Sequence, residues 1–165
     1  MSVQYILKQK LVSLGNNFTI VDLEGREAFR VSGALATLGD KLSFTDANGN
    51  ELLYIEQKVL SWVGMYEVWR DGKVVAEVRR NLRSLLRRRF TVETTSAEKL
   101  EMVGDLLAFE YVVTRGGRKA ATFTRQWLRL SDTYWIQIAD NEPDVILMLA
   151  LAVIVEVIAN RRHNY

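Results

Sequence analysis

Residue types that support common enzyme chemistries are scarce in this 165-residue chain. It contains no cysteine, which excludes disulfides and thiolate catalysis. Its only histidine, His163, lies in the C-terminal RRHNY, where we expect an exposed tail. A transition metal would then depend on carboxylates alone, and a serine–histidine–aspartate triad would place its base on that tail. We therefore expect no metal site, no cofactor and no enzyme activity.

The chain has a single proline, Pro143, so its turns must be made by other residues. Turn signals occur at residues 22–25, 46–49, 71–72, 95–98 and 116–117. Glycines 25, 49, 72 and 117 are 24, 23 and 45 residues apart, which indicates a strand–turn–strand unit about every 22 to 24 residues. The segment 46–51 (DANGNE) faintly resembles a calcium loop but lacks the ligand spacing and the flanking helices. We therefore predict a hairpin turn there.

Long apolar runs are also absent, except at residues 145–155, which read VILMLALAVIV. A helix that is apolar on every side must be buried all round. As a helix this run covers about 16 Å, and about 22 Å if it continues to Ala159, with Glu156 inside it. A membrane span needs roughly 20 apolar residues, so we predict a helix over about 142–160 buried inside a soluble fold without a transmembrane span.

Helix-end signals flank this run. Asn141 is the expected N-cap, with Glu142 and Pro143 in the first turn and Asp144 three residues after the cap.

The N-terminal MSVQYILKQKLVS has no apolar signal-peptide core, which favours a cytoplasmic protein.

Between the turns, apolar and polar residues alternate as they do in half-buried strands. Tyr66 and Val68, for example, precede the 71–72 turn, and Ala76 and Val78 follow it. Counting from Gln4 gives about 12 strands before the helix. The sequence therefore predicts a mainly β, single domain over residues 1–165, in which a closed antiparallel barrel encloses the hydrophobic C-terminal helix.

Short phrases follow one another in a specific order over nearly the whole chain. They are YILKQK at 5–10, FTIVD at 18–22 with Gly25, DKL at 40–42, DANG at 46–49, ELL at 51–53, IEQK at 55–58 and YWIQI at 134–138, and then the apolar helix. In this order they resemble the LURP-one-related proteins of the tubby C-terminal-like superfamily. The resemblance implies a closed barrel threaded by its last helix. It implies little about function, because the superfamily includes phosphoinositide-binding tubby domains and phospholipid scramblases. One departure is Glu156, where some relatives carry aspartate in the last helix.

The strongest functional signal is a basic run inside one connection between strands, although the net charge of the chain is only +2. The run contains Arg79, Arg80, Arg83, Arg87, Arg88 and Arg89. Two further cations, Arg118 and Lys119, join it if their hairpin lies close to the run in space. A guanidinium group binds phosphate bidentately, which favours docking on anionic head groups. Leucines at 82, 85 and 86 give the run an amphipathic character suited to a membrane surface. Alternatively the run is a solvated connection whose leucines cap the barrel, since charge runs are usually solvated faces.

Two functions remain open. The first is a non-enzymatic binding module, peripheral at an anionic membrane surface. The second is a protein-interaction scaffold that meets an acidic partner and has no small ligand. Nucleic acid is disfavoured because the run lacks interleaved aromatics. Trp62 and Trp127, near expected loops, either cover the barrel ends or enter a lipid interface, whereas Trp69 and Trp135 fall in expected strands.

Overall fold

The structure, a computed structural model, describes residues 2–9, 17–34, 39–60, 64–81, 87–105, 110–128 and 131–160. This part of the chain contains twelve strands followed by one helix. The strands are β1 (Ser2–Gln9), β2 (Phe18–Val21), β3 (Glu27–Ala34), β4 (Lys41–Asp46), β5 (Glu51–Lys58), β6 (Met65–Arg70), β7 (Lys73–Asn81), β8 (Arg87–Thr94), β9 (Lys99–Asp105), β10 (Glu110–Arg115), β11 (Arg118–Leu128) and β12 (Ser131–Ala139), and the helix is α1 (Val145–Asn160).

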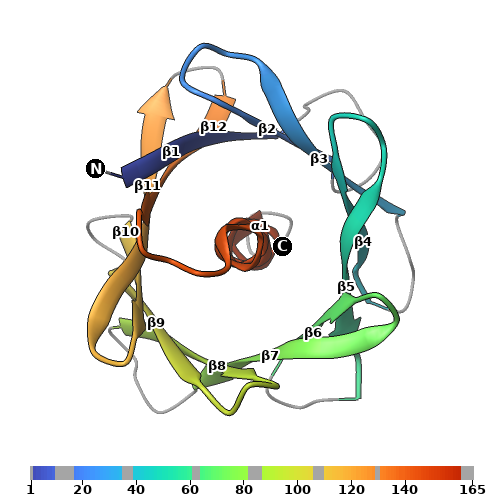
Figure 1. Cartoon of the computed structure of the whole chain (residues 1–165), viewed down its shortest axis with the longest axis vertical. Helices are drawn as coiled ribbons and strands as arrows, with labels where there is room; N and C mark the ends of the chain where they lie inside the picture. Colours follow the sequence, from blue (N-terminus) through green and yellow to red (C-terminus); the bar gives the residue numbers. More distant parts are fainter. Residues whose placement is uncertain are drawn as a thin grey trace.

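The strands form one closed antiparallel barrel, which Figure 1 shows as a ring around α1. Each strand pairs with its neighbours in sequence, and the ring closes where β1 pairs with both β2 and β12. In that closing pair Ile6 lies opposite Trp135. Closure leaves no unpaired strand edge. The prediction of a mainly β barrel of about twelve strands is confirmed.

The five predicted turns are the tight hairpins that join β2 to β3, β4 to β5, β6 to β7, β8 to β9 and β10 to β11. They all lie at one end of the barrel, here called the turn end, because successive hairpins are two antiparallel strands apart. The opposite end, where β7 leads to β8, is the connection end. Asp46 shows the turn chemistry, since its carboxylate accepts the Asn48 and Asn50 backbone N–H groups at 2.9 Å. Asp71 and Gly72 have φ values of 50° and 72°, the left-handed conformation of a type I′ turn.

The lumen is filled by α1. The helix has 16 residues and spans about 24 Å, and its residues 148–154 are fully buried. Large inward side chains from the strands, such as Phe18, Phe44 and Phe123, pack around it with no exposed surface. The barrel therefore buries the apolar run. Within the described residues, no helix has the length and apolar character that a membrane crossing requires.

The helix begins at Val145, three residues later than expected, and Asp144 caps it instead of Asn141. The Asp144 carboxylate accepts the Leu147 N–H at 3.0 Å, and its carbonyl accepts the Met148 N–H at 3.2 Å. The same carboxylate accepts two hydrogen bonds from Arg70, at the turn end of β6, at 2.9 and 3.1 Å.

Glu142 lies before the helix instead of in its first turn. It is buried, and it accepts hydrogen bonds from the Arg115 guanidinium at 2.8 and 3.2 Å. Arg115 is the last residue of β10, at the turn end, and it also bonds Glu98, the last residue of the β8–β9 turn. Together with the Arg70 pair, these bonds fix the chain where it enters the lumen.

Candidate functional site

Strand alternation divides the arginine run into an inward and an outward set. In β7 Val78 is buried against the core, so Arg80 also points toward the lumen while Arg79 points outward. In β8 Phe90 is buried, so Arg88 points inward. The run therefore does not form one continuous surface.

Of the inward arginines, Arg88 belongs to a polar cluster near the C-terminal part of α1. Arg88 donates from Nη1 to the Tyr111 hydroxyl at 3.2 Å, and the Arg125 guanidinium lies 5.8 Å from the centroid of the Tyr134 ring. Glu156 on α1 is 1% exposed and faces this group. Burial raises the pKa of Tyr134, and the neighbouring Glu156 carboxylate raises it further, so the phenol stays protonated. We call these five residues the mouth cluster.

Arg125 is a member of the mouth cluster that was not predicted from the sequence. A signal was available for Arg125, because it continues the inward series of Ala121 and Phe123 along β11. A charged residue at an inward position of a strand indicates a buried partner.

Arg79, Arg87 and Arg89 form the outward set, here called the outer arginine patch. Arg87 and Arg89 are exposed and two residues apart, which places them about 7 Å apart along one face of β8. Arg79, on the paired strand β7, has a side chain that is 53% exposed and lies 2.8 Å from the Glu77 carboxylate. The hydrogen bond that Arg79 donates to the Glu77 carboxylate raises the pKa of Arg79, so its charge is permanent. The patch presents guanidinium groups to solvent in a form that suits phosphate.

Arg118 and Lys119 do not join this patch. They begin β11 directly after the Gly116–Gly117 turn, and they are exposed at the turn end, opposite the outer arginine patch. There they line a pocket of about 370 Å³ beside Asn141 and Pro143. Three strands, β8, β9 and β10, lie between the β7–β8 connection and the Gly116–Gly117 turn, so in an antiparallel barrel the two lie at opposite ends. The condition that this hairpin lies close to the arginine run is therefore not met. Arg83 and the leucines around it lie outside the described residues.

The remaining candidates contribute little to a site. Trp69 lies in β6 and Trp135 in β12, as expected, and the backbone of Trp127 belongs to β11. Trp62 and His163 lie outside the described residues. Over the described ranges, no group of three or more histidine, aspartate or glutamate side chains is placed to hold a metal ion. The side chain and the backbone N–H of Asn50 both donate hydrogen bonds to the Asp46 carboxylate and lower its pKa, with the side-chain bond having the larger effect. These bonds are typical of a hairpin turn.

Comparisons with known proteins agree with this geometry. A family model described as LURP-one-related matches residues 3–156. The uncharacterized protein YxjI of Bacillus subtilis (strain 168) is 33% identical over 156 residues, which cover 94% of this chain and 93% of that protein. An X-ray structure of a protein from Arabidopsis thaliana has the same fold, with a TM-score of 0.69 at 18% identity over 95% of this chain and 92% of that one. The chain therefore belongs to the LURP-one-related family.

Proposed function

We propose that this protein is a non-enzymatic binding module that docks on the anionic phosphate head groups of a membrane surface through the outer arginine patch. The observation that carries this proposal is the placement of Arg79, Arg87 and Arg89 on one outer face at one end of the barrel. Each cation near an anionic surface contributes about 1 kcal/mol to binding. The protein would attach peripherally, with its helix inside the barrel.

The filled lumen supports the non-enzymatic part of the proposal. Residues 148–154 of α1 have no exposed surface, so the barrel interior offers a substrate little space. At the connection end, Arg88 and Arg125 are engaged with Tyr111 and Tyr134. These inward arginines stabilise the barrel mouth, which leaves docking to the outward set.

The Arg79–Glu77 pair does not prevent docking. The pair is exposed, and exposed pairs contribute about 0.2–1 kcal/mol. A phosphate group that accepts two hydrogen bonds from Arg79 therefore competes well with Glu77. Arg89 then extends the same phosphate-binding face on β8.

Vesicle co-sedimentation tests the proposal. The protein is mixed with neutral phosphatidylcholine vesicles or with vesicles that also contain phosphatidylserine and a phosphoinositide, at low and high salt. We expect binding to the anionic vesicles only, and we expect it to weaken at high salt because the charges are screened. Combining Arg87→Ser with Arg89→Ser removes about 2 kcal/mol of attraction, a loss in affinity of roughly thirtyfold.

The chain supplies a matched control. Combining Arg118→Ser with Lys119→Ser removes the same charge from the opposite end of the barrel and should leave binding nearly unchanged. Equal losses in both double variants would show that net charge, and not the patch, drives binding. An unaltered protein that ignores anionic vesicles but binds an acidic protein would favour the scaffold hypothesis and overturn the membrane proposal.

A further inference from the structure

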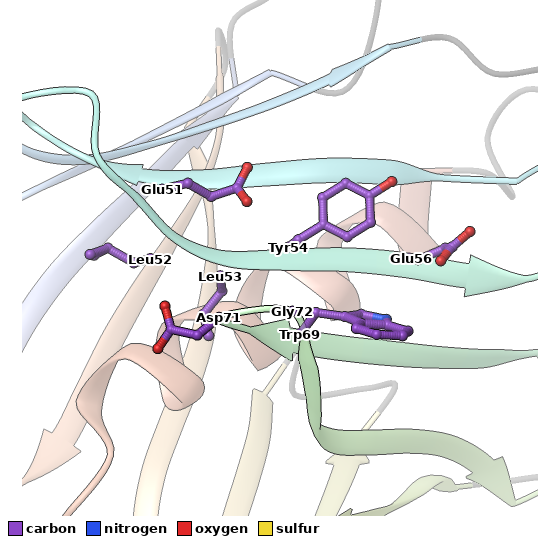
Figure 2. Close-up of a pocket in the computed structure, with 8 residues that line it drawn as sticks. All are labelled: Glu51, Leu52, Leu53, Tyr54, Glu56, Trp69, Asp71 and Gly72. Atoms are coloured by element: carbon purple, nitrogen blue, oxygen red, sulfur yellow. The ribbon is translucent and has the colours of Figure 1, made fainter.

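A second site lies on the outer wall, between the turn-end halves of β5 and β6. It is a pocket of about 370 Å³ that opens to solvent, shown in Figure 2. Two aromatic side chains, three carboxylates and two leucines contribute to its lining: Tyr54, Trp69, Glu51, Glu56, Asp71, Leu52 and Leu53. This volume is at the small end of ligand pockets, which suits one side chain better than a large ligand.

The aromatic wall of this pocket is fixed by its neighbours. Tyr54 and Trp69 lie directly opposite each other across β5 and β6. The Trp69 indole N–H donates to Glu67 at 3.1 Å, and Glu67 also pairs with Lys58 at 2.9 Å. The Lys58 ammonium nitrogen lies 6.0 Å from the centroid of the Trp69 ring. This indole is thus held in place, and it already attracts one ammonium group within the chain.

The charge of the pocket has one sign. Its lining contains three carboxylates and no lysine or arginine. Glu51 accepts a hydrogen bond from Ser43 at 2.6 Å, which leaves its charge in place. Burial raises the pKa of Tyr54, and the negative charges of Glu56 and Glu51 raise it further. The electrostatic potential at the Tyr54 hydroxyl is therefore negative, which favours a cation in the pocket.

The pocket also stands at one end of an acidic row on the outer wall. Across β5 to β8, Glu56 lies opposite Glu67, Glu67 opposite Glu77, and Glu77 opposite Glu93. Like charges directly opposite each other destabilise a sheet. Lys58 and Arg79 offset the two central glutamates at 2.9 and 2.8 Å, whereas Lys41 lies 3.9 Å from Glu56. A cation bound beside Glu56 would relieve the remaining repulsion.

We infer that this pocket binds a lysine or arginine side chain presented by a partner protein. The aliphatic stem packs on Tyr54 and Trp69, and the charged head lies among the carboxylates. The site is separate from the outer arginine patch, which lies at the other end of the barrel, so it does not depend on docking to phosphate. Both surfaces can be occupied at once.

Nuclear magnetic resonance of the tryptophan indole N–H groups tests this inference on the full chain. The chain has four tryptophans, and the Trp69 signal is identified by its loss in Trp69→Phe. The probes are blocked tripeptides Gly-Lys-Gly and Gly-Arg-Gly, with Gly-norleucine-Gly as the neutral control, at matched ionic strength. We expect a saturable shift of the Trp69 signal with both cationic peptides and none with norleucine.

Two substitutions remove charge from the pocket with little risk to the fold. Asp71→Asn suits the left-handed turn, because asparagine tolerates positive φ, and Glu56→Gln keeps the length of the side chain. We expect each to weaken peptide binding about threefold and both together about tenfold. Glu101→Gln, which removes an exposed carboxylate from β9 outside the pocket, is the matched control and should change nothing.

Three results would show that the pocket does not bind cationic side chains. They are a Trp69 signal that does not move, an equal shift with norleucine, and undiminished binding in the doubly substituted protein. Tetramethylammonium that binds as tightly as the peptides would assign the pocket to free organic cations, and would overturn the protein-partner assignment.

Discussion

Asp144 has two roles that substitution can separate. It caps α1 through the Leu147 N–H, and its carboxylate forms a two-hydrogen-bond pair with Arg70. Loss of an N-cap costs about 1 kcal/mol. The side chains of the pair are 35% and 25% exposed for Arg70 and Asp144, so screening limits its contribution to about 1 kcal/mol despite the bidentate geometry.

These magnitudes predict a graded series in the free energy of unfolding. Asp144→Ala loses both roles and should cost about 2 kcal/mol. Asp144→Asn keeps a side-chain oxygen for the cap and should cost about 1 kcal/mol, as should Arg70→Met. The combination of Asp144→Asn with Arg70→Met should also cost about 1 kcal/mol, because the pair can be lost only once.

Urea unfolding followed by tryptophan fluorescence measures the series. The midpoint should shift while the slope with urea stays constant, since the surface exposed on unfolding does not change. If Asp144→Asn costs as much as Asp144→Ala, the cap contributes nothing. If the single costs of Asp144→Asn and Arg70→Met add in the double variant, the two side chains do not stabilise each other, and the reasoning about the lumen entrance is refuted.

Three further predictions concern the core and the turns. Gly104→Ala would place a Cβ atom 2.6 Å from Cδ1 of Tyr111, so it should cost about 1–3 kcal/mol in urea unfolding, and Tyr111→Leu in the same chain should recover part of that loss. Leu149→Ala, at a fully buried position of α1, should cost about 2–5 kcal/mol by the same assay, and a smaller loss would mean that the lumen collapses around the cavity. The lowered pKa of Asp46 means that its contribution to stability is present above its unfolded pKa and is lost as the pH falls through the native value. Asp46→Asn should therefore flatten the acidic side of a plot of unfolding free energy against pH, and an unchanged profile would contradict this.

The fold was predictable because local signals agree with one another. Strand alternation, turn chemistry and one wholly apolar helix all point to the same architecture. Gly25, Gly49 and Gly72 lie in successive hairpin turns at the same end of the barrel. Their spacing is regular because the chain passes through two strands between one such turn and the next. The helix is 16 residues long and has no polar face, so it must be buried on every side, and the lumen of the barrel provides that burial.

The site was predictable only in part. The division of the arginines was contained in the sequence, because Arg80 stands two residues after Val78 and Arg88 two before Phe90, in strands with a period of two. The start of the helix was harder to predict, since Asn141 and Asp144 are both good caps. Arg70, which favours Asp144, is 74 residues away in sequence and meets it only after the barrel has closed.

The charges at the two ends of the barrel follow from the direction in which α1 threads it. A helix carries partial positive charge at its N-terminus and partial negative charge at its C-terminus. At the turn end, the carboxylates of Asp144 and Glu142 meet the N-terminus, each held by an arginine. At the connection end, Arg88 and Arg125 belong with Glu156 to the mouth cluster, near the C-terminus of α1. Because side chains alternate along a strand, the neighbours of the inward Arg80 and Arg88, which are Arg79, Arg87 and Arg89, lie on the outer face. The same ends of β7 and β8 thus carry both the inward arginines and the outer arginine patch.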